Sequence, residues 1–214
     1  LVTGVGLASC GHKVTCVDID KGKVDQINRG ESPIYEKSLS PLLQRVLRER
    51  TFSATGDLRS AVLDSEITFL AVPTPSRKDN AIDLRYITKV SKEVASALAL
   101  TTDYHTVVVK STVTPETCSK VILPILKKGS GRKSGEFGLC MNPEFLREGN
   151  AVFDFMNPDR IVIGEFDKKS GDSLVRVYRS FHADIVRTSL ENAEMIKYTN
   201  NAFLGALISF SNEI

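Results

Sequence analysis

Two glutamates, Glu144 and Glu148, stand four residues apart in a segment that reads Asn-Pro-Glu-Phe-Leu-Arg-Glu. Asn142 is a favoured N-cap and Pro143 is favoured at the first helical position, so this pattern predicts a helix that starts here. Both carboxylates would then share one helix face, where either could orient or deprotonate a substrate hydroxyl, directly or through a water. A structural interpretation stays open, because acidic residues also stabilise the first turn of a helix.

A second pair with the same spacing lies near the end of the chain, where Lys197 and Asn201 are four residues apart. They share one face of a helix predicted over residues 190–213. A lysine on a helix is often solvated, but the neighbours of Lys197 are largely apolar. A partly buried ammonium can stabilise a developing oxyanion, so the pair is a candidate for catalysis.

Asp18 ends a β-branched segment that starts at Lys13. An acidic side chain at the end of the second strand of a dinucleotide-binding fold accepts hydrogen bonds from the adenosine ribose and disfavours NADP. The alternative is that Asp18 only caps a helix. Gly4 and Gly6 begin a dinucleotide fingerprint, but Ser9 stands at the place of the third glycine, so that segment is interpreted as a helix with small residues.

Two polar loops follow predicted strands. Val72-Pro73-Thr74-Pro75-Ser76 follows a strand, and Lys110-Ser111-Thr112-Val113 follows the next strand along the chain. The two prolines stiffen the first loop. Open α/β sheets bind ligands at the carboxyl ends of their strands, so hydroxyls and backbone amides of both loops are expected along one rim.

Strands and helices are predicted in alternation. Strands are predicted over 13–19, 67–72, 106–109, 137–141 and 160–163. Helices are predicted over 21–30, 38–49, 84–98, 115–127, 169–180 and 190–213. This alternation implies a doubly wound, mainly parallel α/β sheet of the Rossmann type, followed by a long helix with apolar side chains on more than one face.

Composition excludes several classes of protein. The 214 residues include 28 Lys+Arg and 26 Asp+Glu, a net charge of +2, which provides no strong field for nucleic acid or an anionic membrane. We find no apolar run long enough for a membrane helix and no secretory signal in the sequence. The basic segment Lys127 to Glu136 is short and lacks aromatic residues, so a mobile surface loop is expected there. The four cysteines lack zinc spacing, which favours no metal and a reduced, cytoplasmic protein.

Seven separated blocks resemble one enzyme family. They are VDID at 17–20, PIYE at 33–36, VPTPS at 72–76, KSTV at 110–113, NPEFLREG at 142–149, NPDRIVIG at 157–164 and ENAEMIKYTNNAF at 191–203. In order and spacing they resemble the UDP-glucose/GDP-mannose dehydrogenase family. The block that contains PDRIVIG is more similar to the UDP-glucose members.

The resemblance implies an activity and a role for each matching residue. The family uses two NAD⁺ and a cysteine to oxidise the C6 alcohol of a nucleotide sugar to a carboxylate, which here implies UDP-glucose to UDP-glucuronate. NAD would be held by Asp18, Lys23, Val72, Pro73, Thr74, Pro75, Ser76, Ser111, Thr112, Val113 and Glu148. Catalysis would use Glu144 as general base or acid, Thr112 to hold a water, Lys197 to stabilise an oxyanion and Asn201 beside it. The nucleotide sugar would contact Glu144, Phe145, Leu146, Arg147, Glu148, Lys197 and Asn201.

The resemblance also implies that the sequence is the amino-terminal part of a longer enzyme. The chain starts at Leu1, and we expect residues 1–188 to form an NAD-binding domain that lacks its first strand and glycine-rich turn. Residues 189–214 would begin the central helix of the family's homodimer. None of the four cysteines matches the catalytic one, so this polypeptide alone is expected to be inactive. Alternatives are a GDP-mannose or UDP-N-acetylmannosamine dehydrogenase, and a non-catalytic nucleotide-binding module.

Overall fold

The computed structural model describes residues 1–79 and 81–214. Its strands are β1 (Val14–Val17), β2 (Phe52–Thr55), β3 (Ile67–Leu70), β4 (His105–Val109), β5 (Phe137–Met141), β6 (Arg160–Glu165) and β7 (Asp184–Ser189). Its α-helices are α1 (Val2–Ser9), α2 (Lys21–Asn28), α3 (Leu39–Arg48), α4 (Leu58–Leu63), α5 (Arg85–Leu98), α6 (Leu123–Ser130), α7 (Ala151–Met156), α8 (Lys168–Val177) and α9 (Leu190–Glu213). A π-helical turn, Cys118–Ile122, leads into α6.

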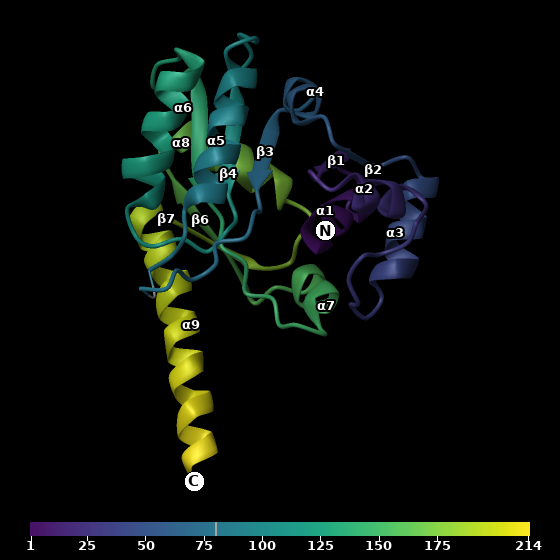
Figure 1. Ribbon diagram of the computed structural model, residues 1–214, viewed down its shortest axis with the longest axis vertical. Coiled ribbons are helices and arrows are strands. Elements are labelled where there is room, and N and C mark those ends of the chain that lie inside the picture. Colours follow the sequence, from purple (N-terminus) through teal and green to yellow (C-terminus); the bar gives the residue numbers. More distant parts are fainter. Residues whose placement is uncertain (80) are drawn as a thin grey trace.

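The strands form a mainly parallel arrangement, as predicted. β3, β4, β5, β6 and β7 lie in that order in a five-stranded sheet, while β1 and β2 pair with each other in parallel (Figure 1). β5 and β6 are antiparallel and pair through Cys140 with Glu165 and Met141 with Gly164. The other neighbouring strands of the larger sheet run parallel.

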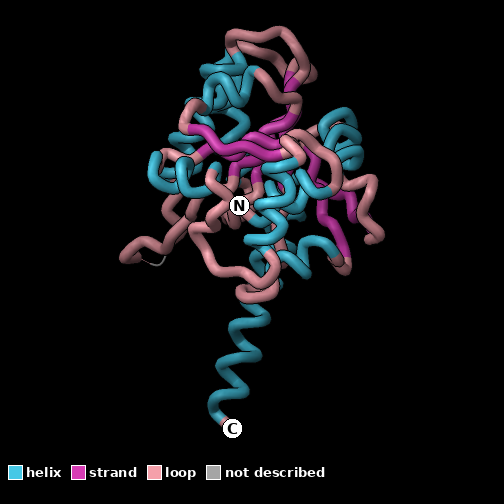
Figure 2. The backbone as a smooth tube through the Cα atoms, turned by 90° about the vertical axis from the view of Figure 1, so that its right-hand side faces the viewer, coloured by secondary structure: helices cyan, strands magenta, loops and turns pink. Residues whose placement is uncertain are grey.

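Helices cover both faces of the larger sheet, so the doubly wound prediction is confirmed (Figure 2). Val107 and Val109 of β4 belong to the cluster that contains buried residues of α5 and α6, whereas Val108 belongs to the cluster that contains Leu174 of α8. Each of these strand side chains is completely buried. A strand that is covered on both faces needs a continuous apolar run, because successive side chains point to opposite faces.

The elements that the sequence pattern did not predict are short or polar. In β2, buried Phe52 and Ala54 alternate with an exposed serine, and β7 carries Asp184 and Arg187 along an exposed edge. α4 and α7 have six residues each, which is too short for a clear helical period. All the predicted strands and most of the predicted helices are present, with ends that differ by a few residues.

The prediction of a helix that starts after Asn142 is wrong. Residues 142–150 contain no helical segment, and α7 begins at Ala151. Asn142 is almost completely buried, and its side chain donates to the Val162 carbonyl at 2.9 Å and accepts from the Tyr178 hydroxyl at 2.6 Å. Because the core occupies this amide, it is not available to cap a helix.

The basic segment after α6 is anchored to its neighbours. α6 continues to Ser130, and Gly131 then adopts a φ of 70°, a conformation that glycine reaches without strain. The Arg132 guanidinium donates to the carbonyls of Thr101, Asp103 and Glu136. These contacts tie the loop that was expected to be mobile to the neighbouring turn.

α9 begins against the sheet and then extends away from the molecule (Figures 1 and 2). Leu190, Ala193, Glu194 and Lys197 are buried, while residues 201–214 are exposed. Among the residues that the structure describes, no helix is both long and apolar enough to cross a membrane.

Candidate functional site

The two predicted cofactor loops lie together at the carboxyl ends of β3 and β4. The Ser111 hydroxyl donates to the Val72 carbonyl at 2.6 Å, and the Thr74 hydroxyl donates to the Thr112 carbonyl at 2.7 Å. Pro73, Pro75 and Ser76 are exposed. The side chain of Val113 is completely buried in the core, so it would have only its backbone to offer a ligand.

Asp18 directly follows β1, and the helix-capping role that was its alternative interpretation is taken by Asp20. Asp20 caps α2 by accepting from the Lys23 amide at 3.2 Å. The Asp18 carboxylate uses Oδ1 to accept from the Asp20 amide at 2.9 Å. A half-buried carboxylate with a second oxygen at the end of β1 has the acceptor chemistry that ribose hydroxyls require. The side chain of Lys23 is exposed on the first turn of α2.

Glu144 and Lys197 meet, although they come from distant parts of the chain. Glu144 Oε1 lies 3.2 Å from Lys197 Nζ, with 33% of the Glu144 side chain exposed but 6% of the Lys197 side chain. Glu144 Oε2 accepts from the Leu146 amide at 2.6 Å. Lys197 Nζ also lies 5.4 Å from the centre of the Phe145 ring, a cation–π distance. The pair therefore has one buried cation and one carboxylate that solvent or a substrate can reach.

The side chains of the remaining predicted substrate residues do not join this pair. Arg147 points to Asp154, with Nη2 at 2.7 Å from Oδ1, and Glu148 is exposed beside it. Leu146 packs against the core. Asn201 lies one helical turn beyond Lys197 on α9 and is exposed, so the two residues share a helix face but not the same buried surroundings.

Two buried residues near this pair, Lys110 and Tyr178, were not predicted as site residues, and both contact Asn142, which was predicted only as a helix cap. Lys110 Nζ donates to both the main-chain oxygen and Oδ1 of Asn142, at 3.3 Å each. The Tyr178 hydroxyl donates to the same Oδ1. The one signal in the sequence is that Lys110 directly follows the continuous apolar strand that ends in Val107-Val108-Val109. A charge at the end of such a strand is held at the rim of the sheet.

The loop that carries Glu144 is also tied to the first part of the chain. Glu36, at the end of the block PIYE, accepts from the amides of Gly149 at 2.9 Å and Ala151 at 3.2 Å. Gly149 has a φ of 81°, which favours glycine. The segment before α3 therefore helps to fix the loop between β5 and α7.

Comparison with known proteins decides the family. A family model described as "UDP-glucose/GDP-mannose dehydrogenase family, NAD binding domain" matches residues 1–182. The chain belongs to the UDP-glucose/GDP-mannose dehydrogenase family. The matched part is the NAD-binding domain, and its cofactor is NAD.

Relatives that are named for different substrates are similar to this family member. It is 46% identical over 209 residues to the GDP-mannose 6-dehydrogenase of Pseudomonas aeruginosa, a match that covers 97% of this chain and 48% of that protein. It is 41% identical over 221 residues to a UDP-glucose 6-dehydrogenase of Haloferax volcanii, covering 99% of this chain and 51% of that protein. A crystal structure of a ternary complex of GDP-mannose dehydrogenase from Pseudomonas aeruginosa has a TM-score of 0.97 at 45% identity, covering 100% of this chain and 49% of that one. The chain thus spans about half the length of these relatives.

Three thiols of this dehydrogenase-family chain are poorly suited to nucleophilic chemistry. Burial raises the pKa of the Cys16 and Cys118 thiols, and it raises the pKa of Cys140 to about 12. The thiolate is the reactive form of cysteine, so these groups are protonated and inert near neutral pH. They act as apolar residues of the core or its edge.

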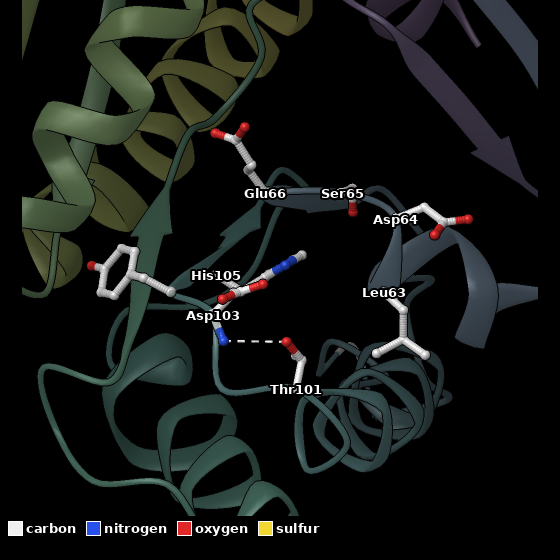
Figure 3. A pocket seen from close by; sticks show the side chains of 8 residues that line it. Leu63, Asp64, Ser65, Glu66, Thr101, Asp103 and His105 are labelled. Atoms are coloured by element: carbon white, nitrogen blue, oxygen red, sulfur yellow. Dashed lines mark hydrogen bonds between the residues drawn. The ribbon is translucent and has the colours of Figure 1, made fainter.

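A separate hollow of about 220 Å³ lies at the amino ends of β3 and β4, opposite the carboxyl ends that carry the predicted cofactor loops (Figure 3). It is lined by Leu63, Asp64, Ser65, Glu66, Thr101, Asp103, Tyr104 and His105, none of which is a predicted site residue. The His105 Nε2 and the Thr68 hydroxyl are 2.8 Å apart. Burial lowers the pKa of His105 from 6.5 to about 4.

The buried imidazole of His105 predicts an acid-sensitive fold. Between about pH 4 and 6.5 the unfolded chain protonates this residue and the folded chain does not. The neutral imidazole therefore makes its full contribution to the free energy of unfolding above pH 6.5. As the pH falls below this value, the free energy of unfolding decreases by at most about 1.4 kcal/mol per pH unit. His105→Gln should flatten the difference between urea unfolding free energies at neutral and acidic pH. Equal pH dependence in variant and wild type would contradict this expectation.

Proposed function

We infer that this chain is the NAD-binding part of an enzyme that oxidises the C6 alcohol of a nucleotide sugar to a carboxylate. The observation that carries this inference is the contact between Glu144 and Lys197, at 3.2 Å, beside the NAD-binding fold. A partly exposed carboxylate can accept the proton of a substrate hydroxyl or of a water. A buried ammonium next to it can stabilise the oxyanion that forms.

The rim fits the cofactor of the family. Asp18 supplies the ribose acceptor, and the loops Val72–Ser76 and Ser111–Val113 supply hydroxyls and backbone groups that are already held together. Glu148 is exposed in a non-helical segment, which leaves its side chain able to approach a bound cofactor. Bound NAD⁺ would accept the hydride from C6. The roles of Lys23, Thr112 and Asn201 are part of the same proposal and come from the family pattern alone.

Two nucleotide sugars are supported by different observations. The block that contains PDRIVIG, at residues 158–164, favours UDP-glucose. The relatives named GDP-mannose 6-dehydrogenase favour GDP-mannose, since one of them is 46% identical to this chain while two UDP-glucose 6-dehydrogenases are 41% identical. Their shared chemistry is a sugar carbon that bears a primary alcohol, attached to a nucleoside diphosphate.

A substrate panel with the full-length protein tests this proposal. We expect NADH to form with NAD⁺ and either UDP-glucose or GDP-mannose, at two NADH for each sugar oxidised, and UDP-N-acetylmannosamine serves as the third candidate. The polypeptide of residues 1–214 alone should give no sustained turnover. Nucleotide binding by calorimetry without NADH from any sugar would instead indicate a non-catalytic module.

The proposal extends to assembly and location. Residues 1–188 form the NAD-binding domain and residues 189–214 begin a central helical domain, a division supported by the start of α9 at Leu190. Exposed apolar side chains on α9 are covered by a second copy in a homodimer; they are Phe203, Leu204, Leu207, Ile208 and Phe210. The mass of the full-length protein in solution tests the dimer.

The proposed location is the cytoplasm, because the four cysteines are free.

A further inference from the structure

Lys110 is a buried cation that the proposed reaction does not use. Its side chain follows β4, and 7% of the residue is exposed. Two of its three ammonium N–H groups are accounted for by the oxygen atoms of Asn142, at 3.3 Å each. Both acceptors are uncharged, although burying a cation is costly unless an opposite charge compensates it.

Asn142 links Lys110 to three other elements. Its amide nitrogen donates to the Val162 carbonyl of β6, its Oδ1 accepts from Tyr178 at the end of α8, and its main-chain N–H donates to Val109 of β4. Glu144 follows two residues later. The direction in which the chain leaves β5, and hence the place of Glu144, depends on how Asn142 is held.

The charged groups that face Lys110 are Glu144 and Lys197. Burial lowers the pKa of Lys110 to about 8, the charge of Glu144 raises it, and the charge of Lys197 lowers it. Tyr178 is the titratable group on α8, and burial raises its pKa, so it is neutral throughout the working range. Glu144 is thus a carboxylate that interacts with both ammonium groups, by an ion pair of 3.2 Å with Lys197 and through its charge with Lys110.

We propose that Lys110 is a positioning residue that holds Glu144 in place through Asn142 and keeps a second positive charge behind the Glu144–Lys197 pair. This inference rests on the proposed dehydrogenase function. Lys110 does not touch the substrate. It fixes the loop that starts at Asn142, and its positive charge attracts the Glu144 carboxylate.

The test compares Lys110→Met with Tyr178→Phe in the full-length enzyme. Methionine keeps the length of the side chain and removes its charge, whereas Tyr178→Phe removes one hydrogen bond to Asn142 and keeps the charge. We expect Lys110→Met to lower kcat by about 10- to 100-fold, because small displacements of a catalytic group cost this much, with KM for NAD⁺ unchanged. Tyr178→Phe should have a smaller effect. Lys89→Met, which removes an exposed charge from α5, is the control and should match wild type.

The pH dependence separates this role from a merely structural one. Because the wild-type ammonium loses its proton as the pH rises through about 8, the ratio of wild-type kcat to Lys110→Met kcat should decrease across this range. A ratio that stays constant with pH would overturn the proposal, as would a Lys110→Met enzyme with wild-type kcat. If Lys110→Met does not fold, Lys110→Gln, which keeps a donor for Asn142, replaces it. An inactive wild-type enzyme would contradict the proposed function instead.

Discussion

Replacing Lys197 with methionine in the full-length enzyme is expected to lower kcat by about 10²- to 10³-fold, the usual cost of removing a preorganised group that stabilises an oxyanion. The Lys197 side chain is nearly buried, and its ammonium lies 3.2 Å from Glu144. Methionine fills the same volume without the charge. Glu144 keeps contact with solvent and with the Leu146 amide, so the protein should still fold. Initial rates of NADH formation measure the loss.

Two comparisons make the Lys197 result specific. Lys120→Met removes the exposed partner of Glu116, with which it pairs at 2.7 Å, and should leave kcat unchanged. Glu144→Gln combined with Lys197→Met should lower kcat by less than the product of the two single effects, because residues that act as one unit are not additive. A Lys197→Met enzyme whose kcat is close to wild type would show that this lysine is not part of the chemistry.

Replacing Gly164 with alanine is expected to lower the free energy of unfolding by about 1–3 kcal/mol, as overpacking of a rigid core does. A Cβ at this position of β6 would lie 2.6 Å from Ala193 Cβ, 2.8 Å from the Ser189 oxygen and 3.0 Å from Leu190 Cα. Two of these neighbours are backbone atoms at the junction of β7 and α9, and they cannot rotate away. α9 would have to move off the sheet, and Lys197 would move with it. Urea denaturation measures the change in stability, and kcat should fall in parallel.

A second glycine provides the matched control for this prediction. A Cβ at Gly56, which is exposed between β2 and α4, would meet only the Asp18 main-chain oxygen, at 3.8 Å, an ordinary van der Waals contact. Gly56→Ala should therefore leave stability unchanged or raise it by up to about 1 kcal/mol, because alanine lowers the conformational entropy of the unfolded chain. If Gly164→Ala were as stable as Gly56→Ala, the close packing of α9 on β6 would not matter to the fold.

Much of the secondary structure was predictable because the order of apolar and polar residues along the chain reflects which side chains are buried. Phe137–Met141 is a continuous apolar run and forms the fully buried strand β5, and residues 190–213 form one helix as predicted. The family followed from separated blocks of residues, and the model match to residues 1–182 agrees with it. The sequence pattern did not predict β7, because a strand at the edge of a sheet is partly exposed and does not need a continuous apolar run.

The sequence by itself determined the α/β class, the family and the positions at the ends of strands where polar groups gather. Only the tertiary structure decided which of these groups meet. Asn142 has the sequence of a helix cap, but Lys110 and Tyr178 hold its side chain in the core instead. Glu144 meets Lys197 while Asn201 stays exposed. Spacing along one helix decides which residues share a face. Which part of that face becomes buried depends on the packing of α9 on β6, and this packing brings together residues that are far apart in the chain.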